Sequence, residues 1–354
     1  MSFETLEELL EEIAPGTTLR DAIDRIVEQG HGGLLVLSPL DEIERIITTG
    51  FQVDAEVTAQ RLSELSKMDG AIVIDDSLRR ITYANAHLSP DPSIESLETG
   101  TRHKAAEQTA KQLKLPVIAV SERRDRVTVY YKNQRYILRD ISTIMSKVNQ
   151  ALLIMDQYRG NYDEAIQELT ALELDGNVLP FHVANPLTKI GQMLTLKEEI
   201  LRMFIELGEE KALPGRQLDN MIAGIESDLE FIIKDFHKTE PEGDLEEIRA
   251  KIIDLCTDTP PSTKNIMALL GYEEEDLDDF LAPRGYRVLH QIPRLPHTVI
   301  ERMVDKFDNL EGILSAKREE LQEVKGIAET RSNTIKAGLK RLENRITLME
   351  ELET

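Results

Sequence analysis

Residues 68–75 read MDGAIVID, an acid and a glycine followed by four apolar residues and a second acid. A short apolar run that is rich in β-branched residues and bounded by turn residues predicts a buried strand. Four more runs of this kind surround it, and they are GLLVLS (33–38), RITYAN (80–85), PVIAVS (116–121) and VTVYY (127–131). Short strands in such close succession predict one sheet.

The segment before the first strand has a helical pattern. LRDAIDRIVEQ (19–29) places its apolar residues on one helical face, Thr17 and Thr18 can cap its start, and Gly30 can end it. Helical segments that alternate with strands are typical of an α/β domain. We therefore expect a mixed, twisted sheet flanked by helices over residues 1–140.

The rest of the chain carries no strand pattern. Residues 141–285 show the spacing of amphipathic helices and are expected to form a helical spine. Residues 286–354 contain two copies of one layout, 288–307 and 321–342, each with a short helix, a tight turn and a second helix. The fold class that we predict is multidomain, with an α/β domain, the all-α spine and a C-terminal tandem helix-hairpin-helix domain.

The composition limits the possible partners. Of the 354 residues, 41% are hydrophobic and 30% charged, which excludes a disordered chain. The net charge of −23 opposes non-specific binding to nucleic acid or anionic membrane. Residues 286–345 are the exception, because they contain twelve Lys and Arg and nine Asp and Glu, which gives a local charge of +3. Phosphate contacts with DNA are therefore expected only in this segment.

The number of cysteines and the hydropathy of the sequence indicate the cellular compartment. Cys256 is the only cysteine, which excludes an intrachain disulfide and a zinc site built from cysteines. No basic leader precedes an apolar stretch, and no run of about 18 apolar residues occurs. We expect a cytoplasmic protein that makes no membrane contact.

Asp69-Gly70-Ala71 is the first of three stretches that combine small residues, charge and strand ends, as nucleotide sites in α/β folds do. The glycine lets a ligand approach the backbone, and the carboxylate could hold a magnesium ion or position a hydroxyl. A strand-edge Asp-Gly that stands alone is more often only a turn.

The second stretch is GTRHKAAE (100–107), whose first two residues open a predicted helix. Free N–H groups and the positive end of the helix dipole favour an anion there. Arg102 and His103 lie in the first turn, where cations are unfavourable unless a negative ligand compensates. The third stretch is the SERR turn (121–124), whose arginines could clamp a phosphate or simply be solvated.

Together, MDGAIVID, ANAHLSPD (84–91), ETGTRH (98–103) and SERR resemble the diadenylate cyclase family in order and spacing, over about residues 10–140. The resemblance implies that each domain binds one ATP and that two domains meet face to face. Each ribose 3′-hydroxyl would attack the α-phosphate of the opposite nucleotide, so that two ATP give cyclic di-AMP and two pyrophosphates. Mg²⁺ or Mn²⁺ would neutralise charge. The resemblance also implies a homo-octamer held by the spine.

The resemblance assigns roles to single residues. Asp69, Thr101, Arg102 and His103 would be catalytic, and Asp69 and His103 would also serve the metal. The further nucleotide contacts that it implies are Gly70, Ala71, the backbone of Leu88, Gly100, Lys104, Ser121, Arg123 and Arg124. Lys104 and Ala105 depart from the family's Arg-His-Arg-Thr, and a lysine cannot make the two-pronged contact of an arginine. This departure points to slower turnover with activity retained.

The C-terminal repeats resemble paired helix-hairpin-helix units, in which backbone amides at the turn contact a phosphate. The DNA contacts that we expect are Arg294, Lys325, Gly326 and Arg331. Ala328 stands where such turns carry a second glycine, and it would be strained if the backbone needs a positive φ there. Contacts of this type read backbone shape, so we expect branched or damaged DNA to bind independently of sequence and to lower cyclase output.

Three other functions fit part of the sequence. Lys67-Met68-Asp69-Gly70 matches the Lys-x-Asp-Gly core of covalent nucleotidyltransferases, although Ile72 stands where their arginine is expected. The departures at Lys104 and Ala105 would suit a degenerate nucleotide sensor on a DNA-binding scaffold. The C-terminal repeats could also be a protein-protein module, which an affinity indifferent to ionic strength would indicate.

Overall fold

The computed structural model describes residues 3–122, 126–239, 245–257 and 259–353. Its internal contacts divide the chain into two compact units. The N-terminal unit comprises residues 1–149 and 201–215, and the C-terminal unit comprises residues 150–200 and 216–354. The two boundaries between three domains that the sequence predicts, after residues 140 and 285, remain a prediction.

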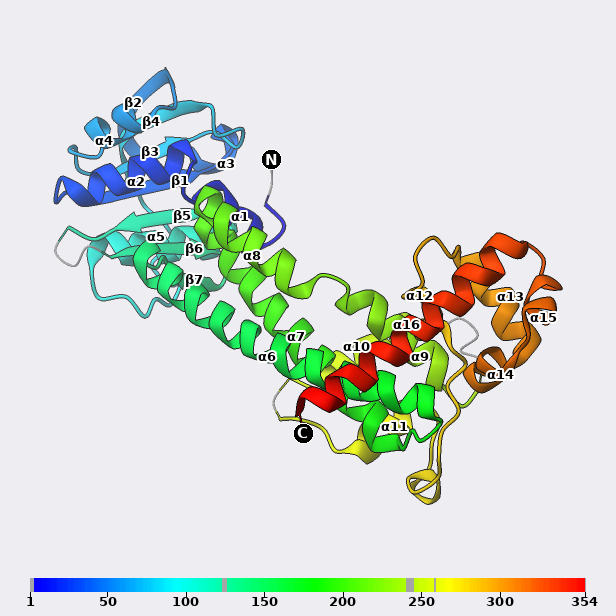
Figure 1. The fold of residues 1–354 in the computed structure, drawn as a ribbon. Helices are drawn as coiled ribbons and strands as arrows, with labels where there is room; N and C mark the ends of the chain where they lie inside the picture. The colour runs from blue at the N-terminus through cyan, green and yellow to red at the C-terminus, as the bar shows by residue number, and fades with distance from the viewer. Residues whose placement is uncertain (1–2, 123–125, 240–244, 258, 354) are drawn as a thin grey trace. The chain divides into compact units, whose positions relative to one another are not determined.

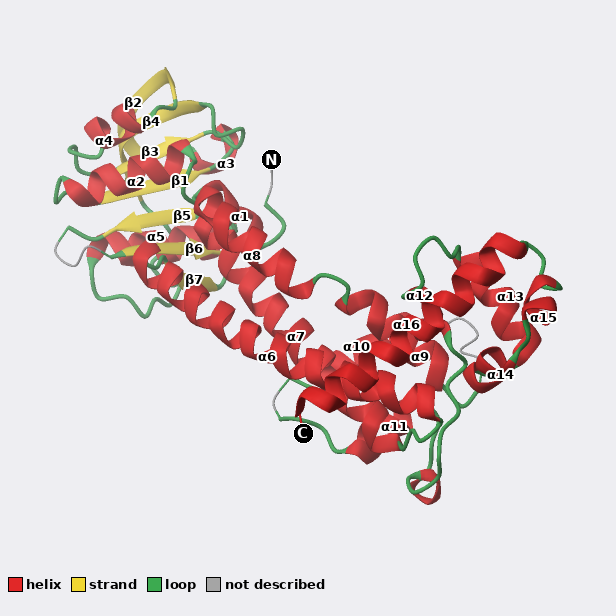
Figure 2. Cartoon of the chain, in the orientation of Figure 1, coloured by secondary structure: helices red, strands yellow, loops and turns green. Residues whose placement is uncertain are grey.

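The N-terminal unit is built on a mixed sheet that has seven strands in the described residues, in the order β2-β4-β3-β1-β5-β6-β7 (Figures 1 and 2). β1 and β3 pair in parallel, and the other neighbours pair antiparallel. The strands are β1 (Gly33–Leu37), β2 (Ile47–Glu56), β3 (Ala71–Ile74), β4 (Arg80–Leu88), β5 (Val117–Val120), β6 (Val127–Tyr131) and β7 (Gln134–Ile137). The expected α/β class with a mixed sheet is confirmed.

Two of these strands, β2 and β7, were not predicted from the sequence. All ten residues of β2 and all four of β7 are exposed or half-buried. Both are edge strands, so each has a strand partner on one side only. A strand that buries neither face needs no apolar pattern, and hydrophobic periodicity cannot reveal it.

Helices cover both faces of the sheet. One face packs against α1 (Leu6–Glu12), α2 (Thr18–Glu28) and α4 (Ala59–Leu65), and the other against α3 (Leu40–Ile43) and α5 (Thr101–Leu113). Successive strand residues alternate between the two cores, as Leu34 and Leu35 of β1 do. Thr17 caps α2 as expected, because its hydroxyl accepts a hydrogen bond from the Arg20 amide at 3.2 Å.

The register of the sheet brings five strand ends to one edge of the sheet, the edge that runs across the strands. Gly33 at the start of β1 pairs with Val120 at the end of β5. Ala71 at the start of β3 pairs with Ala86 near the end of β4. Because β1 and β3 are parallel, and β6 returns antiparallel to β5, the starts of β1, β3 and β6 share this edge with the ends of β4 and β5. All three predicted nucleotide-binding stretches begin or end here.

The C-terminal unit is helical throughout its described residues. Its α-helices, three of which begin or end in the N-terminal unit, are α6 (Ile141–Asp175), α7 (Pro180–Leu207), α8 (Ala212–Ile222), α9 (Ile225–Phe236), α10 (Leu245–Leu255), α11 (Thr263–Leu269), α12 (Tyr286–His290), α13 (His297–Phe307), α14 (Leu310–Ser315), α15 (Arg318–Gln322) and α16 (Glu329–Glu353). Helices α12 to α16 surround one apolar core of their own. The predicted helical region and the paired short-helix layout are both present.

A buried polar cluster joins α6, α9 and the start of α12. Arg287 is 2% exposed, and its guanidinium forms an ion pair with Glu173 and donates to the Thr170 hydroxyl at 3.0 Å. Asp235 accepts hydrogen bonds from three successive backbone amides, at positions 285 to 287, over 2.6–2.9 Å. Burial raises the pKa of Glu173 to about 7, with Arg287 acting in the opposite direction. The cluster therefore depends on the arginine to keep a carboxylate charged inside the protein.

Replacing Arg287 by alanine should lower the free energy of unfolding by about 3–5 kcal/mol, because it leaves the Glu173 carboxylate buried without a counter-charge. Lys67→Ala is the control, since its ion pair with Glu64 is exposed and contributes less than about 1 kcal/mol. Urea unfolding followed by circular dichroism measures both. Equal losses for the two variants would contradict the role given to the cluster.

Candidate functional site

A pocket of about 470 Å³ opens at the edge where the strand ends meet. Its lining residues are Glu98, Thr99, Gly100, Thr101, Arg102, His103, Ser121, Glu122, Arg126, Thr128 and Arg135. Five of the predicted site residues are therefore brought together here, namely Gly100, Thr101, Arg102, His103 and Ser121. Arg123 and Arg124, the other predicted residues of the SERR turn, lie outside the described residues.

The start of α5 forms one wall of this pocket. Gly100 is the N-cap residue, and no side chain caps the helix. The first turn contains no acidic residue, although it carries Arg102 and His103. Unsatisfied backbone N–H groups, the positive end of the dipole and two cation-capable side chains together favour a negatively charged ligand. The sequence-based prediction of an anion site at this helix start stays a prediction, and the geometry supports it.

Gly32 makes room for Arg102 beside the first strand. A Cβ atom built on Gly32 would lie 1.9 Å from the Arg102 Nη1 and 2.5 Å from its Cζ, so the guanidinium occupies the space of the missing side chain. Gly32 directly precedes β1, which lies between β3 and β5. The guanidinium therefore reaches the middle of the strand edge, between the Asp69 stretch and Ser121.

Asp69 and Gly70 directly precede β3, two strands away from Ser121, which directly follows β5. Strands are spaced by about 4.8 Å, so the separation along the edge is about 10 Å. Gly70 has a φ of +94°, and a Cβ there would come within 2.9 Å of the Ala86 carbonyl oxygen. Only glycine fits this close approach to β4. The adjacent Asp69 backbone carbonyl accepts a hydrogen bond from the Asn85 side chain at 2.5 Å. The Asp69 residue is exposed.

The remaining predicted nucleotide contacts do not line the pocket. Ala71 is fully buried as the first residue of β3, and Leu88 ends β4 at 8% exposure. Both lie on the same strand edge as Asp69. Lys104 is exposed, and it is absent from the pocket lining. An extended nucleotide along the edge could contact the first two positions through their backbone, whereas Lys104 would contact it only from outside the pocket.

His103 belongs to a chain of polar side chains inside the pocket. Its Nδ1 lies 3.1 Å from the Tyr130 hydroxyl, which donates to Glu98 Oε1 at 2.8 Å, and Arg135 Nε lies 2.7 Å from the same oxygen. Burial lowers the pKa of His103, Glu98 opposes this shift, and Arg126, Arg102 and Arg135 add to it. Burial also raises the pKa of Tyr130, so its hydroxyl keeps its hydrogen. The imidazole is therefore held neutral.

The sequence reasoning missed several residues of this pocket. Glu98 lies within the quoted ETGTRH run, and Arg126 lies two residues after the SERR turn, so position could have suggested both. Thr128 and Arg135 carry no motif. The Thr128 hydroxyl, in a residue 1% exposed, and the Arg126 Nε are buried and have no hydrogen-bond partner among the described residues. Unpaired donors of this kind in a pocket indicate a polar ligand.

The segment that precedes α5 lies along that helix and is held by its side chains. Glu107, 6% exposed, accepts hydrogen bonds from the Ser96 hydroxyl at 2.6 Å and the Leu97 amide at 3.1 Å. Gln108 donates to the Ile94 carbonyl at 2.7 Å, and Lys111 to the carbonyl of residue 95 at 2.9 Å. These bonds fix the position of Glu98, and through it that of the polar chain.

The protein groups do not form a closed metal site by themselves. Within the described part of the chain, no three His, Cys, Asp or Glu residues are grouped so that they could hold a metal ion. The predicted metal residues, Asp69 and His103, therefore belong to no such group. This fits an ion such as Mg²⁺, which keeps several waters and takes most of its other ligands from substrate phosphates.

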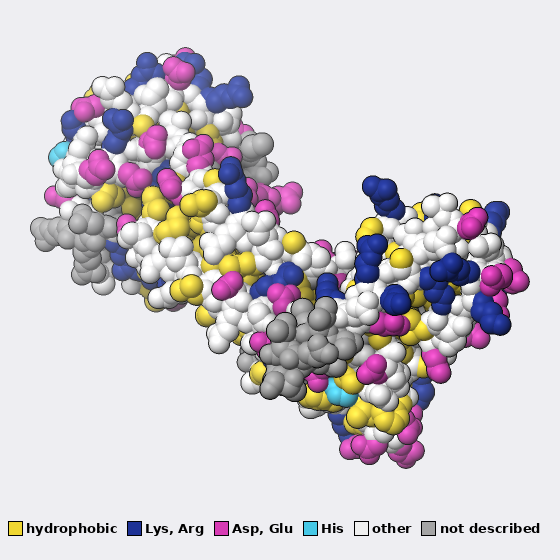
Figure 3. Space-filling view, in the orientation of Figure 1, with side chains coloured by type: hydrophobic (Ala, Val, Ile, Leu, Met, Phe, Trp, Pro, Cys, Tyr) yellow, Lys and Arg dark blue, Asp and Glu magenta, His cyan; other side chains and the backbone are white. Residues whose placement is uncertain are grey.

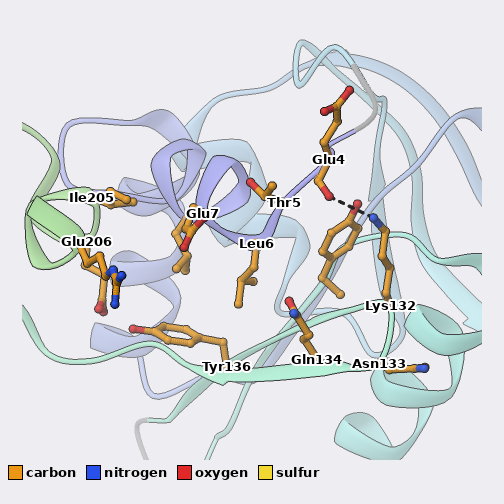
Figure 4. A pocket seen from close by; sticks show the side chains of 13 residues that line it. Glu4, Thr5, Leu6, Glu7, Lys132, Asn133, Gln134, Tyr136, Ile205 and Glu206 are labelled. Carbon is orange, nitrogen blue, oxygen red and sulfur yellow. Dashed lines mark hydrogen bonds between the residues drawn. The ribbon is translucent and has the colours of Figure 1, made fainter. Parts of the chain in front are cut away.

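A second pocket of the N-terminal unit, of about 660 Å³, lies between α1, the β6–β7 hairpin and residues 202–206. Figure 4 shows Leu6 and Tyr136 pointing into it, while Lys132 Nζ donates to the Glu4 carbonyl at 3.1 Å across one end. None of the predicted site residues lines this pocket. It shares no lining residue with the pocket at the start of α5.

In the C-terminal unit, the two hairpins face a groove of about 1050 Å³ that Arg294, Arg331 and Arg341 line together with Glu329. Lys and Arg side chains mix with acidic ones on the visible face of α13 to α16 (Figure 3). Arg331 also donates to the Gly326 carbonyl. Lys325 and Gly326, the other predicted DNA contacts, lie in the second turn and do not line the groove.

The backbone of the two hairpins shows where the unusual conformation lies. Positive φ occurs at Gly326 (+102°) and, at the matching position of the first hairpin, at Arg294 (+63°). Ala328 is not among the residues with positive φ, so the condition under which that alanine would be strained is not met. Arg294 adopts the left-handed conformation that glycine adopts in the second turn, which allows the first turn to lack glycine.

The fold and pocket define a nucleotide-binding α/β domain followed by a helical region, and the comparisons with known proteins agree. Residues 20–135 match the family model described as DisA bacterial checkpoint controller nucleotide-binding, the diadenylate cyclase domain, and residues 138–277 match that of its linker region. This chain is therefore a nucleotidyltransferase of the diadenylate cyclase class.

Similar proteins cover nearly the whole chain. The DNA integrity scanning protein DisA of Carboxydothermus hydrogenoformans is 41% identical over 335 residues, which are 94% of this chain and 95% of that protein. The protein of the same name from Symbiobacterium thermophilum is 39% identical over 345 residues, 98% of each chain. The chain belongs to the family of DNA integrity scanning proteins. Among the described helices, none is long and apolar enough to cross a membrane.

Lys67 does not have the surroundings of a covalent nucleotide carrier. Its ammonium is paired with Glu64 at 2.7 Å on the surface, and it does not line the pocket. Together with the family, this geometry argues against the covalent Lys-AMP alternative.

Gly32→Ala should lower kcat/KM for ATP roughly 10- to 100-fold, because the added methyl group displaces the Arg102 guanidinium from the strand edge. The free energy of unfolding should change little, since the displaced atoms are the end of a flexible side chain. Gly33→Ala is the matched control, because a Cβ there meets its neighbours at ordinary distances of 3.5 Å or more. Equal activity in the two variants, measured by steady-state kinetics, would show that the position of Arg102 does not matter.

Proposed function

We propose that this protein condenses two ATP into cyclic di-AMP and two pyrophosphates, with one ATP bound along the strand edge of each of two facing N-terminal units. The observation that carries this proposal is a pocket with unpaired polar groups, formed by the uncapped start of α5 together with the end of β5 and residues of β6 and β7, at the edge that Asp69 and Leu88 share. The phosphates would lie at the start of α5 and beside Ser121. The ribose and base would extend past Arg102 toward Asp69 and Leu88.

The two halves of the reaction need two copies of the chain. One pocket holds one nucleotide, whereas the reaction joins two, so each 3′-hydroxyl must come from a second subunit. A two-fold arrangement in which both sites face each other meets this requirement. We propose a homo-octamer of four such pairs in the cytoplasm, as the resemblance to the diadenylate cyclase family implies.

A divalent cation, Mg²⁺ or Mn²⁺, would neutralise charge on the triphosphate. The residues that would hold it are Asp69 and His103, which offer an exposed carboxylate and a neutral imidazole. Thr101, Arg102 and Ser121 would orient the phosphates, because they line the pocket and carry donors. Lys104 would contribute charge from the surface alone, so we propose that its difference from arginine slows the reaction without abolishing it.

Asp69→Asn should abolish formation of cyclic di-AMP while ATP binding persists, because the amide keeps the shape of the carboxylate but cannot hold the cation or accept the hydroxyl proton. Mass spectrometry of the products after incubation with ATP and Mg²⁺ or Mn²⁺ measures the effect. Asp54→Asn, at an exposed carboxylate of β2, should leave turnover unchanged. A wild-type protein that makes no cyclic product would refute the proposed function, and an active Asp69→Asn would refute the role of Asp69.

We further propose that the groove between the two C-terminal hairpins binds branched or damaged DNA through the phosphate backbone. Support comes from the local charge of +3 in a chain of −23, and from the two positive-φ turns that match each other. In this proposal Arg294 and Arg331 contact phosphate with side chains, and Lys325 and Gly326 act at the second turn. Bound DNA would lower cyclase output, which a comparison of rates with and without junction DNA tests.

The double variant Arg294→Ala, Arg331→Ala should weaken binding of junction DNA about tenfold or more, with a shallower dependence of log affinity on log salt concentration. The loss should be similar for unrelated sequences, because phosphate contacts do not read bases. Arg61→Ala, in the N-terminal unit, is the control. Fluorescence anisotropy at several salt concentrations is the measurement, and a wild-type affinity that ignores salt would favour a protein-binding module instead.

A further inference from the structure

We infer that Glu98 and Tyr130 are positioning residues that hold His103 with its hydrogen on Nδ1 and an unshared electron pair on Nε2, so that Nε2 is a ligand for a divalent cation and not a donor to phosphate. This inference rests on the proposed function and deepens it. The proposed site assigns His103 to the cation without saying which ring nitrogen binds it, and a contact with phosphate instead would require the opposite hydrogen position on the ring.

The hydrogen positions follow from Glu98, the acceptor at the end of the series of hydrogen-bonded side chains. Glu98 Oε1 lies 2.7 Å from Arg135 Nε, a permanently charged donor, which identifies Glu98 as a carboxylate that can only accept hydrogen bonds. The Tyr130 hydroxyl lies 2.8 Å from the same oxygen and must donate its single hydrogen to it. Its oxygen can then only accept from His103 Nδ1, 3.1 Å away. The ring hydrogen of a neutral His103 is therefore on Nδ1.

The other ring nitrogen is left for a ligand. His103 lines the pocket, and the described residues supply no hydrogen-bond partner for Nε2. A nitrogen with a free electron pair binds a cation or accepts a hydrogen, but it repels a phosphate oxygen. Histidines that bind metals commonly donate their other N–H to a fixed acceptor, which orients the ring. The Tyr130 hydroxyl, itself fixed by Glu98, supplies that acceptor here.

Other side chains already provide the positive charge that phosphates need. Arg102, Arg126 and Arg135 line the same pocket as His103. Arginine keeps its charge at any accessible pH and offers forked donors, which suit phosphate oxygens. A second class of ligand is needed for the cation, and a neutral imidazole supplies it. In this arrangement the guanidinium groups bind phosphate and His103 binds the cation.

Two sets of contacts hold the hydrogen-bonded side chains of Glu98, Tyr130 and His103 in place. Tyr130, 1% exposed, packs in the core between the sheet and α5 together with Ala106 and Ala110. Glu98 is fixed by Arg135 of β7 and by the preceding segment, which Glu107 holds against α5. Neither residue could reposition without a change in the core or in that segment. A change of tautomer at His103 would therefore cost a buried hydrogen bond.

The hydrogen position can be measured directly in the metal-free, nucleotide-free full-length protein. Solid-state NMR of a sample labelled with 15N-histidine reports which ring nitrogen carries the hydrogen, and the His103 signal is assigned by its loss in His103→Asn. We expect Nδ1 protonated and Nε2 unprotonated in the wild type. In Tyr130→Phe, which keeps the ring in the core, we expect a substantial Nε2–H population. Wild-type protein with the hydrogen on Nε2 would overturn the inference.

Binding measurements separate metal from phosphate. Electron paramagnetic resonance with Mn²⁺ and a non-hydrolysable ATP analogue should show Mn²⁺ affinity at least about tenfold weaker in Tyr130→Phe. Affinity for the analogue at saturating Mn²⁺ should be unchanged, and a loss confined to the analogue would overturn the inference. Tyr131→Phe is the matched control, because this neighbouring hydroxyl donates to the Phe3 carbonyl and lies outside the pocket.

The two proposals fail in different ways. Wild-type protein that forms cyclic product while His103 carries its hydrogen on Nε2 would refute the positioning role and leave the proposed function intact. Wild-type protein that forms no cyclic product would refute the proposed function whatever the tautomer. Should Tyr130→Phe not fold, the wild-type spectrum still decides the inference.

Discussion

The parallel pairing of β1 with β3 is the constraint on which the N-terminal unit depends. Parallel strands must start at the same edge, and the chain between them must cross over to return there. The antiparallel neighbours β4 and β5 then end where the parallel pair begins. One edge consequently receives five chain segments with polar or glycine-rich sequences. This pairing places Asp69, Arg102 and Ser121 along the same edge of the sheet.

Small residues at this edge are as important as the charged ones. The guanidinium of Arg102 occupies the space beside Gly32, and the turn at Gly70 lies against β4 with a φ that other residues rarely adopt. Both glycines therefore set the position of a neighbouring polar group. The site is built by the absence of side chains at these two positions and by buried polar bonds around His103.

Much of the fold could be predicted from the sequence, because it follows from patterns of burial. The five buried strands, the cap at Thr17 and the helical region all have an apolar pattern or a capping residue. The exposed edge strands β2 and β7 do not, and they could not be found this way. In the second hairpin, the sequence drew attention to Ala328, whereas the unusual backbone conformation lies at Gly326 and, in the first hairpin, at Arg294.

The candidate site was predictable where residues lie close together in the chain. The helix start at 100–103 and Ser121 line one pocket, whereas Thr128 and Arg135 join them from other strands and carry no local motif. Their contribution depends on pairing between strands, which a single sequence does not reveal. The same holds for the link from His103 through Tyr130 to Glu98, because its members are up to 32 positions apart along the chain.

Helix α5 contributes to the pocket and to the segment before it through two groups of residues, and the distance between these groups along the helix is fixed. Its first turn lines the pocket, and Glu107, Gln108 and Lys111 hold the preceding segment along its side. One added or removed residue between these positions would rotate them by about 100° relative to each other. Natural variation in this family should therefore include many substitutions on the surface of α5, but insertions and deletions within residues 102–107 should be strongly selected against.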